Sequence, residues 1–229
     1  MFFWDPTYII VLPAILLALY AQMRVRSTYA RYSRVPIANG LSGAEAAAEI
    51  LRRQGLSGLQ IERIDGTLTD HYDPRTRVLR LSSDVYNGTS VAAVGVAAHE
   101  SGHAIQHAQH YAPLALRSAI VPVTQFGSWM AWPIFFIGFF FHSGTFMQLG
   151  ILIFSAFVAF TVVTLPVEFD ASRRALRVLA AEHLMTDDEL RGVRAVLGAA
   201  ALTYVAAAST AILELLRLLL LYNMSRREE

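Results

Sequence analysis

The segment from residue 97 to residue 107, AAHESGHAIQH, places a glutamate between two histidines that are four residues apart. On a helix, residues four apart lie on one face, so His99 and His103 can direct their imidazoles to a single metal ion with Glu100 beside them. The pattern His-Glu-x-x-His is typical of zinc hydrolases, in which zinc binds the two histidines and the glutamate takes a proton from the attacking water. The alternative is a polar helix face whose histidines are merely hydrogen-bonded.

A catalytic zinc usually has three protein ligands and one open position. The chain has no cysteine, so the third ligand must be His, Asp or Glu. His107 and His110 follow the motif, but His107 stands about 12 Å along the helix from His99, too far for one ion. We expect the third ligand to be Glu168, because its segment LPVEFDASRRAL lies where the chain returns from the membrane to the side of the histidine helix. The alternative for Glu168 is an acid that stabilises a helix N-terminus.

Asp170 is the second choice for the third ligand. It could instead orient a histidine or pair with Arg173 or Arg174. The developing oxyanion also needs a partner besides the metal, and Tyr204 and His71 as well as Arg173 are candidates.

Several elements must position these residues, and the first is an apolar segment over residues 7–23. It is followed at once by the basic residues Arg24, Arg26, Arg31 and Arg34. Basic residues favour the cytoplasmic side, so we expect a membrane-spanning helix with the following chain inside the cell. A cleaved signal peptide is the rival interpretation, but it would carry basic residues before the apolar run.

Residues 35–118 are predicted to form a cytoplasmic segment. The capping box Ser42–Glu45 opens a helix, and IERI, TLTDHY and RVLRLS read as short strands before the histidine helix. The third strand, residues 77–82, is a candidate edge strand that would bind a peptide by backbone hydrogen bonds. An interior strand is the alternative.

Residues 119–167 contain two long apolar runs separated by HSGT, which predict a transmembrane hairpin. Arginines before and after it return both ends to the cytoplasmic side. Residues 168–185 are then predicted to form a cytoplasmic helix that begins near Glu168, with Pro166 suited to its first turn.

The capping box TDDE predicts a long helix over residues 186–222, either a fourth membrane span or a helix on the membrane surface. Glu214 and Arg217 lie close to one turn apart on it and are able to pair. Charges at such positions are costly in lipid unless they face protein or the interface.

The composition agrees with a membrane protein. Hydrophobic residues make up 55% of the chain and charged residues 16%, whereas a soluble domain carries about 25% charge. The net charge of +1 gives no sign of a nucleic-acid partner. The expected fold class is a mainly α membrane protein, with a zincin-like α+β cytoplasmic domain around the histidine helix and about four transmembrane helices.

Three segments in this order resemble the YugP-type bacterial neutral zinc metallopeptidases: LTDHYDPRTRVLRLSSDVYNG, VAAHESGHAIQH and LPVEFDASRRAL. The layout is also distantly similar to the HtpX-like membrane proteases, whose Glu-x-x-Ala-Asp segment supplies a zinc ligand. That resemblance implies Glu168 as the ligand and matches Ala171. Ser172 stands where that family has Asp, which leaves the role of that acid in doubt.

We expect a multi-pass protein of the cell membrane that cleaves protein or peptide substrates, some of them membrane-associated, at a Zn²⁺ site on the cytoplasmic face. His99, His103 and Glu168 would bind zinc, and Glu100 would act as general base. The main alternative is a non-catalytic membrane scaffold with a structural or regulatory zinc site. A transporter is less favoured, because no span shows paired interrupted helices.

Overall fold

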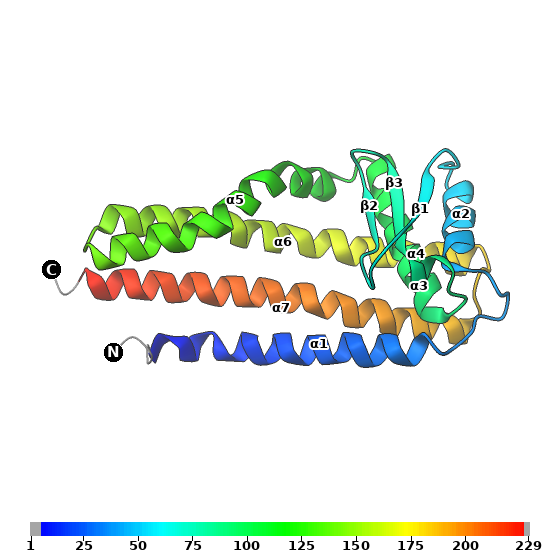
Figure 1. Cartoon of the computed structure of the whole chain (residues 1–229), viewed down its shortest axis with the longest axis horizontal. Helices are drawn as coiled ribbons and strands as arrows, with labels where there is room; N and C mark the ends of the chain where they lie inside the picture. The colour runs from blue at the N-terminus through cyan, green and yellow to red at the C-terminus, as the bar shows by residue number, and fades with distance from the viewer. Residues whose placement is uncertain (1–5, 227–229) are drawn as a thin grey trace. The chain divides into compact units, whose positions relative to one another are not determined.

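The computed structural model describes residues 6–226, apart from the side chains at positions 122, 123, 125, 126 and 128. The chain is mostly helical with one small sheet (Figure 1). In chain order the elements are η1 (Pro6–Ile10), α1 (Leu12–Tyr32), α2 (Gly43–Arg53), β1 (Gln60–Ile64), β2 (His71–Asp73), β3 (Val78–Ser82), α3 (Ser83–Tyr86), α4 (Val91–Ala108), α5 (Ala112–Phe140), α6 (Gly144–Ala181) and α7 (Asp187–Ser225).

The chain divides into two compact units. One, called here the mixed unit, consists of Gln22–Ala115 and Pro166–Leu202 and contains the sheet. The other, called the helical unit, consists of Met1–Ala21, Leu116–Leu165 and Thr203–Glu229. The histidine motif and Glu168 both belong to the mixed unit.

In the mixed unit α4 is packed on two sides. Ala97 and Ala104 contact a core that includes Leu79 and Leu81 of β3. On another side α4 belongs to a core with the C-terminal part of α6 and the first turns of α7. The small residues of VAAVGVAA allow this double packing, and 13 of the residues of α4 are buried. The histidine helix is therefore held firmly by apolar contacts.

The sheet has the order β1-β3-β2, with β1 parallel and β2 antiparallel to β3. Three strands are present as predicted, although the second covers only His71–Asp73 and not the whole of TLTDHY. The candidate edge strand at residues 77–82 is instead the interior strand of the alternative. β3 lies in the centre because Leu79 and Leu81 are fully buried, each contributing about 1.5–3 kcal/mol by leaving water. The edges of the sheet are β1 and β2, and β2 contacts α4.

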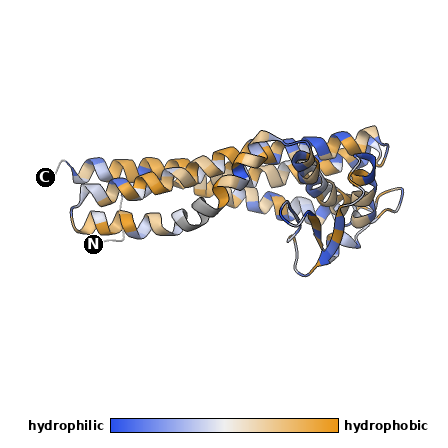
Figure 2. Ribbon diagram, turned by 90° about the horizontal axis from the view of Figure 1, so that it is seen from above, coloured by the Kyte–Doolittle hydropathy of each residue, from blue (hydrophilic) through white to orange (hydrophobic). Residues whose placement is uncertain are grey.

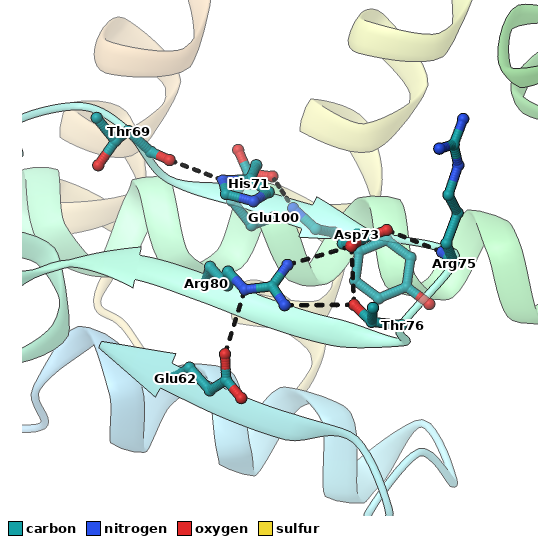
Figure 3. Close-up of polar contacts among 9 residues, drawn as sticks. Glu62, Thr69, His71, Asp73, Arg75, Thr76, Arg80 and Glu100 are labelled. Atoms are coloured by element: carbon teal, nitrogen blue, oxygen red, sulfur yellow. Dashed lines mark hydrogen bonds and ion pairs between the residues drawn. The ribbon is translucent and has the colours of Figure 1, made fainter. Parts of the chain in front are cut away.

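Polar side chains tie the three strands together (Figure 3). Arg80 of β3 reaches Glu62 of β1 and Asp73 of β2, at 3.2 Å in each case. Asp73 also accepts hydrogen bonds from the Arg75 backbone N–H at 2.9 Å and the Thr76 hydroxyl at 2.8 Å. These two bonds and Arg80 hold the pKa of Asp73 at about 2. The turn after β2 is therefore fixed by its own sequence.

Both predicted capping boxes are present. The Ser42 side chain accepts from the Glu45 N–H while the Glu45 carboxylate accepts from the Ser42 N–H. At the start of α7 the Glu189 carboxylate accepts from the Thr186 N–H at 2.7 Å. Local bonds of this kind explain why these two starts are readable from sequence.

In the helical unit α5, α6 and α7 share an apolar core, which includes Phe135, Met147, Phe154 and Leu218. A Cβ at Gly150 would lie 2.8 Å from the Phe135 nitrogen, so the two arms of the α5–α6 hairpin pack backbone to backbone. Figure 2 shows hydrophobic residues predominating along the helices of this unit.

Two helices among the described residues, α6 and α7, are long and apolar enough to cross a membrane. The expectation of about four spans is therefore wrong. Before Leu12 the chain forms a 3-10 helix, so the apolar α-helix between Leu12 and Arg24 is only about 18 Å long, short of the roughly 30 Å of hydrocarbon. The described part of α5 offers two shorter apolar stretches, Ala112–Val121 and Trp129–Phe140.

The expected helix start near Glu168 is also wrong, because α6 runs without interruption from Gly144 to Ala181 with Pro166 inside it. An interior proline removes one backbone hydrogen bond. Apolar helices packed against neighbours tolerate this loss. The division between the helical and mixed units falls between Leu165 and Pro166.

Glu214 and Arg217 pair as predicted, with Arg217 Nη1 at 2.5 Å from the carboxylate. Arg217 is only 2% exposed. Its Nε donates to the Thr7 hydroxyl at 3.1 Å, and its guanidinium lies 3.7 Å from the centre of the Tyr8 ring. These contacts neutralise the charges within the protein, which reduces their cost in an apolar unit.

Candidate metal centre

The candidate metal centre lies where α4 and α6 approach each other in the mixed unit. Gly102, one residue before His103, makes this approach possible. A Cβ at this position would lie 2.5 Å from the Ala171 carbonyl oxygen of α6, so only glycine fits without moving the α6 backbone. The glycine therefore sets the distance between the histidines of α4 and the carboxylate of α6.

Glu168 of α6 faces both histidines. Its Oε2 is 3.2 Å from His99 Nε2 and 3.5 Å from His103 Nε2. One donor atom from each of the three residues lies within 4.8 Å of the others. Glu168 is only 3% exposed, and a buried carboxylate needs positive charge or donors beside it. Two imidazoles and a carboxylate at these separations are a donor set that suits zinc.

His103 is oriented by Gln106, a residue that sequence reasoning overlooked. The Gln106 amide nitrogen donates to the Val167 carbonyl at 2.8 Å and to Asp170 Oδ2 at 2.9 Å. Because both partners are acceptors, the amide oxygen must face His103 Nδ1, at 3.0 Å. Nδ1 then carries the proton, and the lone pair of Nε2 is left for a metal ion.

His99 has a comparable contact with α6. Its Nδ1 lies 3.1 Å from the Ser172 hydroxyl. The sequence left open what replaces the aspartate of the HtpX-like segment at this position. In this structure the serine takes up the contact with the histidine, and such contacts fix ring orientation.

Glu100 lies on the β2 side of α4 (Figure 3). Its Oε2 accepts a hydrogen bond from the Tyr72 backbone N–H at 3.1 Å. Burial raises the pKa of Glu100, while His103 and His99 offset part of this rise. A raised carboxyl pKa brings the group closer to the working range of a general base near neutral pH.

The pKa of His103 is also displaced. Burial lowers it, but the carboxylates of Glu168 and Glu100 outweigh burial, so the net pKa is raised. The pocket thus favours positive charge at the His103 imidazole. A metal cation would take the place of this positive charge after His103 loses its proton. Because protons and the metal compete for the same nitrogen, metal binding should weaken as pH falls.

The other predicted site residues lie outside the three-residue group. His107 Nδ1 lies 2.8 Å from the Tyr72 hydroxyl. Asp170 accepts from Gln106 and pairs with Arg174, so it reaches His103 through the glutamine. Arg173 is mostly exposed.

Two candidates for the oxyanion partner differ in position. His71 lies on β2, next to the residue that contacts Glu100, and its Nδ1 lies 2.8 Å from the Thr69 carbonyl oxygen. Tyr204 belongs to the helical unit rather than to the unit that holds the histidines. His71 is thus the one of these two that lies in the same unit as the histidines.

Sequence reasoning overlooked Gln106 and Tyr72 for different reasons. Gln106 lies three residues after His103 on the same helix face, so the spacing alone could have predicted a contact between the two side chains. Tyr72 meets Glu100 through its backbone, and no sequence pattern marks such a contact. It depends on where β2 lies against α4.

Comparisons with known proteins identify the family of the chain. A family model described as "Putative neutral zinc metallopeptidase" matches residues 7–223. The chain is also 46% identical over 219 residues to "Putative membrane protease YugP" of Bacillus subtilis (strain 168), which covers 96% of this chain and 97% of that protein. No solved structure matches the chain. The resemblance to YugP-type proteins is thus confirmed.

Proposed function

Because the chain belongs to this family of neutral zinc metallopeptidases, we propose that it is a membrane-embedded zinc endopeptidase. His99, His103 and Glu168 hold the ion, and Glu100 is the general base. The observation that carries the proposal is the convergence of three donors within 4.8 Å, with a carboxylate of raised pKa on the neighbouring residue of α4.

Bound zinc would supply a Lewis acid for the scissile carbonyl and the attacking water. Glu100 then takes a proton from that water. Its Oε2 is held by the Tyr72 N–H, so the side chain has a fixed direction and keeps its second oxygen for the proton. The same carboxyl group delivers the proton to the leaving amine, and the peptide bond is hydrolysed without a covalent intermediate.

The zinc-binding scaffold is the competing function. Structural zinc sites are almost always closed by four protein ligands, whereas catalytic sites keep one position open. The group found among the described residues has three donors. Glu100 would also have no use in a structural site. Both observations favour hydrolysis.

The substrate path follows from the sheet order. β2 is an edge strand that contacts α4, and Tyr72 on it touches Glu100 through its backbone. An extended peptide could add to this edge by backbone hydrogen bonds. We therefore assign the substrate to β2 in place of the central strand β3.

Membrane embedding is supported by the surface of the helical unit. Trp129, Phe141 and Leu152 are 82%, 79% and 68% exposed, and soluble monomers rarely present large contiguous apolar patches. α6 and α7 would span the bilayer, and α5, whose 29 residues are long enough, would carry the chain across it before α6. The arginines before the apolar part of α5 and after that of α6 would then keep the zinc centre on the cytoplasmic face.

Membrane orientation can be checked at Ser143, in the turn between α5 and α6. A Ser143→Cys variant should react with a membrane-impermeant maleimide added to intact cells, because this turn is expected to face out. Cysteines placed at Arg75 should react only after the cells are opened. The reverse pattern would reject the orientation.

Metal dependence tests the enzymatic proposal itself. Purified full-length protein in detergent should cleave unfolded casein, lose this activity after treatment with 1,10-phenanthroline, and regain it when zinc is restored. The reason is that the carbonyl and the water both need the ion. Cleavage that survives complete removal of metal would exclude a metallopeptidase. Zinc binding without any cleavage would favour the scaffold.

A further inference from the structure

A cavity of about 430 Å³ lies in the mixed unit beside the last turns of α4. Its apolar lining includes Leu56, Leu59 and Ala104. These residues come from the chain after α2 and from the face of α4 that packs toward the sheet. The cavity is separate from the three-residue metal group, none of whose members lines it.

Polar groups form the rest of the lining. The Tyr72 hydroxyl lies 2.8 Å from His107 Nδ1, and Tyr72 also interacts with the side chain of Arg77. His110 completes the set. Among the described residues that line the cavity none is acidic, so the charge of Arg77 is not cancelled within it. An apolar wall with a guanidinium, a phenol and imidazoles suits a ligand that ends in a carboxylate.

The backbone at Arg77 supports a role for its side chain. Arg77 has φ +57°, in the left-handed region where glycine or asparagine fits with little or no steric cost. Glycine or asparagine at position 77 would therefore form this turn with less backbone strain than arginine. An arginine at this position is explained if its guanidinium has a use, and such strained positions gather at binding sites.

The cavity and the general base Glu100 lie along the same face of α4. Glu100, Ala104 and His107 occupy one face of α4. Glu100 and His107 are about 10 Å apart along the helix axis. An extended peptide advances about 3.3 Å per residue, so this distance corresponds to roughly three residues of substrate.

We propose that this cavity is a specificity pocket for a substrate carboxylate, located about three residues from the bond that is cleaved. The carboxylate comes from an acidic side chain or from the C-terminus of the peptide. The inference rests on the proposed peptidase function and names its substrate class. Arg77 and His107 are its specificity-determining residues, and they take no part in the chemical step.

Peptide binding tests the proposal without cleavage. The probes are three fluorescein-labelled hexapeptides of alanine and leucine: one with a free C-terminal carboxylate, one with a C-terminal amide, and one with the amide and a central glutamate. Zinc-loaded Glu100→Gln protein in detergent serves as the receptor, and fluorescence anisotropy gives Kd. We expect one or both carboxylate peptides to bind about tenfold more tightly than the neutral peptide, as charged hydrogen bonds do.

Arg77→Asn should remove this preference while leaving Tm unchanged or higher, because asparagine accepts the left-handed backbone. Arg75→Ala is the matched control: it removes an arginine from the same turn whose side chain points away from the strand network (Figure 3) and does not line the cavity. Equal affinity for all three peptides, or a preference that persists in Arg77→Asn, would overturn the proposal. A wild-type protein that binds with the expected preference but never cleaves would reject only the enzymatic function.

Discussion

Replacing Glu100 with glutamine should lower the rate of peptide cleavage by about 10²-fold or more while zinc stays bound. The substitution keeps the size of the side chain, and its amide oxygen can still accept the Tyr72 N–H that the carboxylate accepts at 3.1 Å. The amide cannot take the proton of the attacking water. Loss of a general base of this kind adds about 3 kcal/mol or more to the barrier.

The measurement combines casein cleavage with zinc content for wild type and Glu100→Gln, both purified in detergent. Glu62→Gln is a suitable control, since Glu62 lies on the exposed face of the sheet and contacts Arg80 rather than the histidines. Equal cleavage rates for wild type and Glu100→Gln would reject the base. Loss of zinc together with activity would instead make Glu100 a ligand.

Replacing Glu168 with glutamine should weaken zinc binding by about 10²-fold or more. Apparent binding energies of fully ligated zinc sites are about 10–16 kcal/mol, so one charged ligand carries roughly 3 kcal/mol. Glu168 is almost fully buried and faces both histidines at 3.2 and 3.5 Å. A neutral amide would retain the shape of the site but not the negative charge that attracts the cation. Competition with a fluorescent zinc chelator gives the affinity.

Gly102→Ala checks the same site without removing a ligand. The new methyl group would meet the Ala171 carbonyl oxygen at 2.5 Å, so α6 and its carboxylate must move. We expect a loss of about 1–3 kcal/mol of stability and weaker zinc binding. Gly198→Ala is the control, because a Cβ there has no neighbour within 4 Å and alanine favours a helix. Zinc affinity that is unchanged in both Glu168→Gln and Gly102→Ala would exclude the α6 carboxylate as a ligand.

Features that depend on neighbours along the chain were readable from the sequence alone. The four-residue spacing places His99 and His103 on one helix face because an α-helix repeats every 3.6 residues. The capping boxes at Ser42 and Thr186 form between residues three apart. The pairing of Glu214 with Arg217 is local in the same sense.

The same reasoning failed where distant segments compete for position. β3 is the central strand, with β1 on one side and β2 on the other. This order depends on contacts between residues far apart in sequence. α6 continues through Pro166 because its packing outweighs one lost hydrogen bond. The N-terminal segment is not a candidate span because η1 is a 3-10 helix, which the hydropathy of the segment does not reveal.

The residue types of the candidate site could thus be named from the sequence, since metal chemistry restricts ligands to a few side chains. Their arrangement was decided by tertiary structure. Glu168 reaches the histidines only because Gly102 lets α6 lie against α4. Gln106 orients His103 only because α6 presents the Val167 carbonyl and Asp170 to its amide. Glu100 meets Tyr72 through a backbone amide, a group that every residue except proline possesses and that only the folded chain can single out.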